Sequence, residues 1–274
     1  MSSITVRNLA ENRSLFASGD GERRLDADME FLLRQLDKME PKPIETCTAP
    51  EARAQPTIML ALHRMLRDPD DDQGVNMELR LIPGAAGELR ARIYTPRVLE
   101  ADRTAPIVLY IHGGGWVIGD LDSYDAVPRA LAKRLGAIVV STHYRQAPEF
   151  TFPAAHEDVL AAWRWTLENA KGLGADRRLR AIVGDGAGGN LAVNLVLDAR
   201  AEGLDLPQHL ALITPMTTTD TGLSSHTENR QTKPLNTATV EWFYSKFARD
   251  AVDLHSPRLN LSDRPDLDGL PPTT

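Results

Sequence analysis

The chain has 274 residues, of which 42% are hydrophobic and 25% charged, and it carries a formal net charge of −7 and one cysteine. This composition is typical of a folded domain with a buried core. The chain contains no basic run of the kind that binds nucleic acid, and a single cysteine excludes an internal disulfide and a cysteine-rich metal site. We therefore expect no nucleic-acid partner and no metal site.

The N-terminal residues are polar and contain no apolar signal segment. No stretch of the sequence reaches the ~18 apolar residues that a membrane-spanning helix needs. These features predict a cytoplasmic protein without integral membrane association.

Two segments near the N-terminus have apolar residues at helical spacing. Residues 26–39 place Met29, Leu32 and Leu36 on one face, and residues 56–67 repeat the pattern after Pro56. Such spacing predicts two amphipathic helices, and proline suits the first turn of the second one.

The hydrophobic period changes to two at about residue 77. Residues 78–82 and 89–94 alternate around the turn sequence PGAAG, which predicts an antiparallel hairpin. Continuous apolar runs follow, typical of parallel strands buried on both faces, at 106–111, 137–140, 179–183 and 210–213. Helical patterns separate these runs, at 123–135, 153–170 and 187–202. The alternation predicts an α/β fold with a doubly wound, mostly parallel sheet.

A polar, turn-rich segment at 217–236 interrupts this alternation, and residues 237–247 then show a helical pattern. We expect this excursion and the N-terminal helices to form a helical cap. The predicted organisation is one domain over 1–274, with a cap from about 1–75 and 217–250 and a sheet core from about 77–216 and 251–274. The last nine residues resemble the approach to a further strand.

The sequence His112–Gly113–Gly114–Gly115–Trp116 follows directly on the first parallel strand. Successive glycines let the backbone turn sharply, so that several N–H groups can point into one small volume. Such fixed donors can form an oxyanion hole, which stabilises negative charge on a reacting oxygen. A tight structural loop is the alternative, and the spacing of phosphate-binding glycine motifs is absent. We expect His112 to hold the loop by hydrogen bonds rather than to act as a base.

A second glycine motif follows the third parallel run, with Gly184, Gly186 and Gly188 in the pattern G-x-G-x-G. It corresponds to the nucleophile elbow G-x-S-x-G, with glycine where the serine would stand. In that turn the amide of the next residue, Ala187, completes the oxyanion hole. Asp185 is a poor substitute nucleophile, because the turn should direct its side chain away from position 186.

Four motifs in order resemble those of bacterial hormone-sensitive-lipase-like esterases: HGGGW, HYRQAPE at 143–149, FPAAHED at 152–158 and GDGAGGN at 184–190. The usual forms of the last three are DYRLAPE, FPAALED and GDSAGGN. The resemblance implies an eight-stranded α/β-hydrolase fold, a Ser-Asp/Glu-His triad, and cofactor-free hydrolysis of short to medium acyl esters.

Residue by residue, the resemblance implies an oxyanion role for Gly114, Gly115 and Ala187, with Gly113 beside them, and a nucleophile position at Gly186. The family's acid and histidine follow a G-L-P-P segment, and this chain ends at Thr274 before both. We therefore expect a fold truncated at its C-terminus and a chain without triad-based esterase activity.

The remaining predictions concern the surroundings of the two motifs. Trp116, Asp185, Trp242 and Phe243 are candidates for contact with a small ester or acyl ligand. Arg145 and Glu149 could pair beneath the loop. Other interpretations stay open: a fragment or engineered variant of an esterase, a natural pseudo-enzyme that binds an acyl or carbonyl ligand, and a non-catalytic interaction scaffold. Absent final strands would also leave a sheet edge available for self-association.

Overall fold

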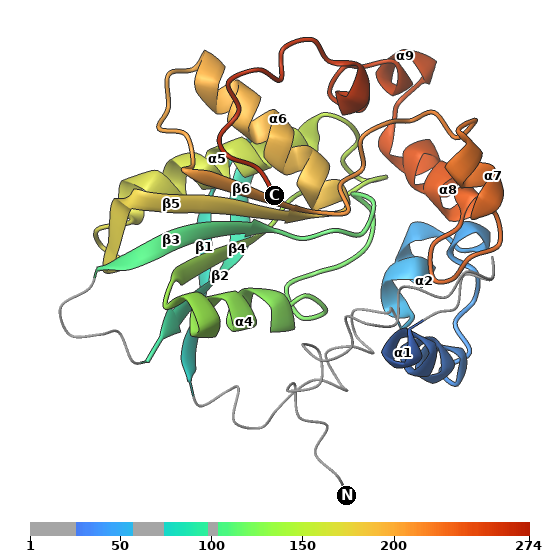
Figure 1. The fold of residues 1–274 in the computed structure, drawn as a ribbon, viewed down its shortest axis with the longest axis horizontal. Coiled ribbons are helices and arrows are strands. Elements are labelled where there is room, and N and C mark those ends of the chain that lie inside the picture. Colours follow the sequence, from blue (N-terminus) through green and yellow to red (C-terminus); the bar gives the residue numbers. More distant parts are fainter. Residues whose placement is uncertain (1–25, 57–73, 98–103) are drawn as a thin grey trace, which may run out of the picture.

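The computed structural model of the protein describes residues 26–56, 74–97 and 104–274. Its centre is a six-stranded sheet in the order β1-β2-β4-β3-β5-β6 (Figure 1). The strands are β1 (Val75–Gly84), β2 (Gly87–Pro96), β3 (Ala105–Ile111), β4 (Ile138–His143), β5 (Ala175–Asp185) and β6 (His209–Ile213).

The predicted hairpin and the four predicted parallel strands are all present. β1 pairs antiparallel with β2, and β2 pairs antiparallel with β4. The strands β4, β3, β5 and β6 run parallel to one another, as their unbroken apolar sequences indicate. The α/β class with a mostly parallel sheet is therefore confirmed.

Helices cover both faces of this sheet (Figure 1). α4 (Ala126–Leu135) lies on one face, and α5 (Ala154–Asn169) and α6 (Ala187–Ala201) lie on the other. The two faces have separate clusters of buried apolar side chains, and the cluster beneath α5 and α6 is the larger. This arrangement places the carboxyl ends of β3 and β5 side by side, because the two strands are neighbours in the sheet.

The other described helices gather at one end of the sheet: α1 (Ala27–Asp37), α2 (Ala49–Ala54), α7 (Ser224–Glu228), α8 (Thr237–Phe247) and α9 (Ala251–Leu254), with 3₁₀ turns η3 (Ile44–Thr46) and η5 (Leu261–Asp263). α2 begins with a capping box in which Thr48 and Glu51 bond each other's backbone amides. The helices predicted at 26–39 and 237–247 are confirmed. The one predicted at 56–67 lies almost wholly outside the described residues.

The N-terminal helices and α8 are joined by polar contacts. The Glu45 carboxylate accepts from the Thr239 hydroxyl at 3.0 Å, and the Trp242 indole Nε1–H donates to the Cys47 carbonyl at 3.1 Å. Figure 1 shows α1, α2, α7 and α8 on the same side of the molecule. Segments about 190 residues apart in sequence thus form one layer, which agrees with the predicted cap; the domain bounds stay a prediction.

Residues 272–274 lie beside β6. The amide of Leu210 donates to the Pro272 carbonyl at 3.0 Å, and the amide of Leu212 donates to the Thr274 carbonyl at 2.8 Å. Thr273 forms a parallel bridge with Leu210. The predicted approach to a further strand is therefore confirmed.

None of the helices in the described part of the chain is both long and apolar enough to cross a membrane. The cytoplasmic location stays a prediction.

Candidate active site

The first glycine turn begins where β3 ends. Gly114 has φ 96° and Gly115 has φ 59°, backbone conformations that residues with side chains rarely adopt. A Cβ on Gly114 would lie 2.1 Å from the Ile118 carbonyl oxygen, so any side chain there would collide with backbone. The turn therefore depends on glycine both for its conformation and for its close approach to residue 118.

Three backbone amides in and beside this turn lack a hydrogen-bond partner within the described part of the chain. Among the described residues, no acceptor pairs with the N–H groups of Gly114 and Gly115, and the same is true of Ala187. Ala187 opens α6, and the first amides of a helix have no partner within it. These are the three donors expected from the sequence, and their oxyanion role stays a prediction.

The outer part of the turn is held by residues that follow β4. The Gln146 amide nitrogen Nε2 donates to the carbonyls of Ile118 and Gly119 at 2.9 and 2.8 Å, and the Ala147 amide donates to the Trp116 carbonyl at 3.0 Å. These bonds satisfy carbonyls that a turn otherwise leaves unpaired.

Arg53 of α2 adds a support that sequence reasoning missed. Its Nε donates to the Val117 carbonyl at 2.7 Å, and its Nη2 donates to the Ala147 carbonyl at 2.6 Å. The same guanidinium pairs with both oxygens of Glu149, at 2.7 and 2.8 Å. The predicted Arg145–Glu149 pair is therefore wrong, because Arg145 is bound to Asp158 at 2.8 Å.

His112 lies buried beneath the turn. Its Nδ1 contacts the Gly113 carbonyl oxygen at 2.8 Å, and its Nε2 contacts Nδ1 of His143 at 3.3 Å. Burial, followed by the neighbouring His143, lowers the pKa of His112 to about 3. With both nitrogens engaged and the ring held neutral, His112 supports the loop as expected from the sequence.

The second glycine turn joins β5 to α6. Gly186 has φ 53° and ψ −113°; its amide donates to the Ile213 carbonyl at 2.9 Å and its carbonyl accepts from the Met216 amide at 3.0 Å. Positive φ at the strand-to-helix junction is the strained backbone that an elbow requires. A Cβ on Gly186 would meet nothing closer than the Gly113 Cα, at 4.0 Å. Position 186 therefore faces the first turn and has room for a side chain.

The flanking glycines of this elbow have no such room. A Cβ on Gly184 would lie 2.4 Å from the Gly188 carbonyl oxygen, and one on Gly188 would lie 2.1 Å from the Ile111 carbonyl oxygen. Strand and helix thus pack backbone against backbone, as the elbow motif predicts.

Asp185 lies behind the elbow, against Gly113. A Cβ on Gly113 would be 3.4 Å from the Asp185 carboxyl carbon and 3.0 Å from the Tyr124 hydroxyl. Burial raises the pKa of Asp185. Its predicted contact with a ligand stays a prediction.

The three aromatic candidates pack around α8. Trp116 is wholly buried and stacks on Phe247 with ring centroids 4.5 Å apart. Phe243 lies directly against Gly115, whose would-be Cβ falls 2.2 Å from the ring. Trp242 is also buried, at the contact with Cys47. In this structure Trp116 and Phe243 pack α8 onto the turn, and Trp242 joins α8 to the N-terminal segment. The ligand contacts of all three stay a prediction.

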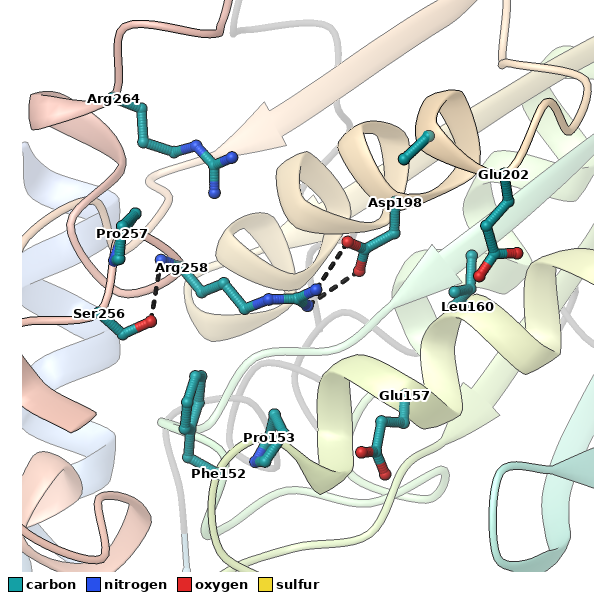
Figure 2. A pocket seen from close by; sticks show the side chains of 11 residues that line it. Phe152, Pro153, Glu157, Leu160, Asp198, Glu202, Ser256, Pro257, Arg258 and Arg264 are labelled. Carbon is teal, nitrogen blue, oxygen red and sulfur yellow. Dashed lines mark hydrogen bonds and ion pairs between the residues drawn. The ribbon is translucent and has the colours of Figure 1, made fainter. Parts of the chain in front are cut away.

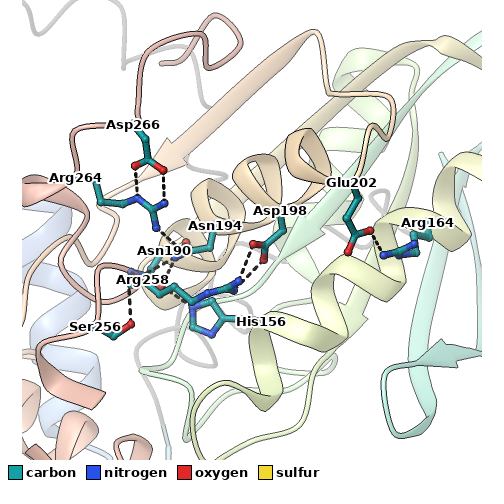
Figure 3. Close-up of polar contacts among 10 residues, drawn as sticks. All are labelled: His156, Arg164, Asn190, Asn194, Asp198, Glu202, Ser256, Arg258, Arg264 and Asp266. Atoms are coloured by element: carbon teal, nitrogen blue, oxygen red, sulfur yellow. Dashed lines mark hydrogen bonds and ion pairs between the residues drawn. The ribbon is translucent and has the colours of Figure 1, made fainter. Parts of the chain in front are cut away.

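An open cavity of about 620 Å³ lies elsewhere, between α5, α6 and residues 256–264 (Figure 2). Arg258 binds both oxygens of Asp198 at 2.7 and 2.9 Å, and Arg264 binds Asp266. Figure 3 shows these pairs, together with the Arg164–Glu202 pair, along α6. The fifth charged residue that lines the cavity, Glu157, pairs with Arg145. The charged groups of the cavity are thus all engaged in ion pairs, and none of the predicted site residues lines it.

In the part of the chain that the structure describes, no group of three or more His, Cys, Asp or Glu residues is placed so that it could hold a metal ion. Gln146 was also missed as a supporting residue. Its place in the sequence HYRQAPE, where the usual motif has leucine, was a visible signal.

Comparisons with known proteins bear on the family. Residues 108–274 match the family model described as alpha/beta hydrolase fold. The chain is similar to Esterase LipI of Mycobacterium tuberculosis, with 41% identity over 201 residues, which are 72% of this chain and 62% of LipI. It is also similar to mouse (Mus musculus) hormone-sensitive lipase, with 32% identity over 68% of this chain and 24% of the lipase.

Among solved structures, the hyperthermophilic esterase from the archaeon Pyrobaculum calidifontis matches with a TM-score of 0.80 and 34% identity, over 91% of this chain and 78% of that one. The chain spans about 60% of the length of LipI. The shared motifs, sheet order and matched region agree: this chain belongs to the alpha/beta hydrolase fold family and, within it, to the hormone-sensitive-lipase-like esterases.

Proposed function

We propose that this chain presents the carbonyl-binding half of a carboxylic ester hydrolase site, for short to medium acyl groups, without a nucleophile of its own. The amides of Gly114, Gly115 and Ala187 are the donors for the acyl oxygen, with Gly113 beside them. The observation that carries the proposal is Gly186, which has the elbow backbone and whose would-be Cβ points toward the Gly113 Cα, 4.0 Å away.

Glycine at 186 cannot form an acyl-enzyme, because it has no hydroxyl. Removing the triad leaves at most about 10³–10⁴-fold catalysis over water in a complete site. His112 is not free to act as a base, since its nitrogens contact the Gly113 carbonyl and His143. The chain as it stands should therefore bind acyl compounds rather than turn them over.

Hydrolysis of p-nitrophenyl butyrate tests the catalytic part of this proposal. The chain and Gly186→Ala should both match the buffer rate. Gly186→Ser should do the same, because a serine needs an adjacent base to become nucleophilic. Enzyme-like turnover by the unaltered chain would refute the proposal. Turnover by Gly186→Ser but not by the unaltered chain or Gly186→Ala would show that a histidine of this chain acts as the base.

Calorimetry with butyrate and ethyl butyrate tests the binding part. Ala187→Pro removes one donor while proline remains acceptable at the first position of a helix. It should weaken butyrate binding by about tenfold, the value of one hydrogen bond of about 1.4 kcal/mol. Ala187→Ser keeps the amide and is the matched control, and circular dichroism checks that α6 still forms. Equal binding by both variants would exclude Ala187 as a donor.

The pseudo-enzyme that binds an acyl or carbonyl ligand is compatible with the same geometry. The interaction scaffold is the alternative outcome, supported if no acyl compound gives heat or a thermal shift.

Self-association is a further part of the proposal. β6 is the edge strand of the described sheet, and β5 is its neighbour. Ile213 on β6 is 46% exposed and Leu179 on β5 is 42% exposed. Residues 272–274 already occupy part of the β6 edge. Light scattering should show a concentration-dependent oligomer, which Ile213→Lys should weaken; a monomer at all concentrations would rule this out.

A further inference from the structure

His143, the last residue of β4, lies between His112 of the first glycine turn and an open cavity. Its Nδ1 lies 3.3 Å from Nε2 of His112, whose own Nδ1 lies 2.8 Å from the Gly113 carbonyl oxygen. On its other side His143 lines an open cavity of about 310 Å³ that Arg53 and Arg90 also line. The two imidazoles thus form a chain from this cavity to the turn.

The Gly113 carbonyl determines which ring nitrogens of His112 and His143 carry a hydrogen. A carbonyl only accepts, so Nδ1 of His112 carries the hydrogen. His112 is neutral, because burial keeps its pKa at about 3, and its Nε2 is therefore an acceptor. Nδ1 of His143 must then donate to it. Burial and the nearby Arg90 and Arg53 lower the pKa of His143 as well, so this ring is also neutral.

The carbonyl of Gly113 and the amide of Gly114 belong to one planar peptide group. In a trans peptide the two point in opposite directions, so fixing the oxygen fixes the N–H. His112 and the Tyr144 hydroxyl, at 3.1 Å, are the side chains that bind this oxygen within the described residues. Gln146 and Arg53 hold carbonyls at 117–119 and do not reach it.

We propose that His143 is a positioning residue for the oxyanion donor at Gly114: it holds His112 in the tautomer that binds the Gly113 carbonyl and so aims the Gly114 amide at the acyl oxygen. This inference rests on the proposed function for the role of that amide. The positioning itself does not require a ligand and can be measured without one.

Substitutions at position 143 distinguish the hydrogen bond that the side chain donates from the space that it fills. His143→Asn can donate its side-chain amide to Nε2 of His112 and should preserve the neutral ring. His143→Asp can only accept when ionised, so Nε2 of His112 would need a hydrogen while Nδ1 keeps its own, which makes His112 an imidazolium. His143→Leu leaves Nε2 as a buried acceptor without a partner, which is costly.

The experiment is ¹H–¹⁵N spectroscopy of the ¹⁵N-labelled chain at pH 7.5, read at the His112 ring and at the Gly114 amide. In the unaltered chain His112 should be protonated at Nδ1 alone. His143→Asp should show both nitrogens protonated. His143→Leu should move the Gly114 amide signal, and His143→Asn should restore it. His156→Leu, a buried histidine bound to Asn190, is the control and should leave both signals in place.

Butyrate affinity gives the functional reading: His143→Leu should weaken binding by about tenfold, the effect of one misaligned donor, and His143→Asn should return to within about twofold. A His112 protonated at Nε2 alone in the unaltered chain would overturn the proposal. So would a Gly114 signal unchanged in both His143→Leu and His143→Asp. If no variant binds butyrate while the spectra behave as expected, the proposed function fails and the positioning role stands.

Discussion

The two glycine turns of the site differ in how they are held in place. The elbow at 184–188 is fixed by close packing, with would-be Cβ atoms 2.1–2.4 Å from backbone atoms at its flanks. The turn at 112–119 also needs glycine at 114, but it is held in addition by polar side chains: its own His112, and Gln146 and Arg53 from elsewhere. The elbow depends on the absence of side chains, whereas the first turn depends on glycine and on polar side chains together. Substitutions should therefore damage the two turns through different mechanisms.

The largest effect should come from adding a methyl group to the elbow. Gly188→Ala would place Cβ within 2.1 Å of the Ile111 carbonyl and 2.5 Å of the His112 carbonyl, and neither backbone atom can move freely. We expect a loss of more than about 3 kcal/mol in the free energy of unfolding, measured with urea. Gly172→Ala, where the nearest atom is 3.5 Å away, is the control and should change stability little. Equal stability of both variants would contradict the packing account of the elbow.

Acid should destabilise the fold through two buried histidines, of which His112 lies beneath the first turn and His156 contacts Asn190 of α6. The pKa of His112 and that of His156 are both about 3 in the folded chain, below the unfolded value of 6.5, so the unfolded state binds more protons as the pH falls. Between pH 6.5 and 5 each histidine should cost roughly 2 kcal/mol of stability. His156→Leu should remove one of these two losses and keep the other, as urea unfolding at pH 5 and 7 would show. An unchanged pH dependence in His156→Leu would mean that His156 is already protonated in the fold.

A side chain at the centre of the elbow should cost less than one at its flanks. Gly186→Ala meets open space, and only its φ of 53° opposes it. We expect a loss of about 1–3 kcal/mol from backbone strain. A loss as large as that of Gly188→Ala would show that position 186 is not open toward Gly113.

The smallest effect should come from one polar support of the first turn. Gln146→Leu removes two hydrogen bonds to the carbonyls of Ile118 and Gly119. We expect a loss of about 1–2 kcal/mol, with the far-ultraviolet circular dichroism unchanged. The exposed Gln208, changed to leucine, is the comparison and should be neutral. A neutral Gln146→Leu would place the support of this turn on Arg53 and the Ala147 amide.

The same contrast explains what the sequence could predict. The strands, the main helices and the elbow follow from local patterns, namely apolar runs, helical spacing and closely spaced glycines. Arg53 was missed because it lies 64 residues before the carbonyl that it binds. The Arg145–Glu149 pair was expected from proximity in sequence, but Asp158 on α5 takes Arg145 and leaves Glu149 to Arg53. Local signals predict backbone geometry, whereas the partners of long charged side chains depend on how distant elements meet.

The chain's one cysteine offers a direct view of how these elements separate. Cys47 is buried, its thiol faces the Pro43 carbonyl at 3.5 Å, and its own carbonyl receives the Trp242 indole. A thiol in this place reacts with an alkylating reagent only when residues 44–54 part from α8. The alkylation rate of Cys47 in the unmodified protein therefore measures how often the helices above the first turn separate, without an engineered label.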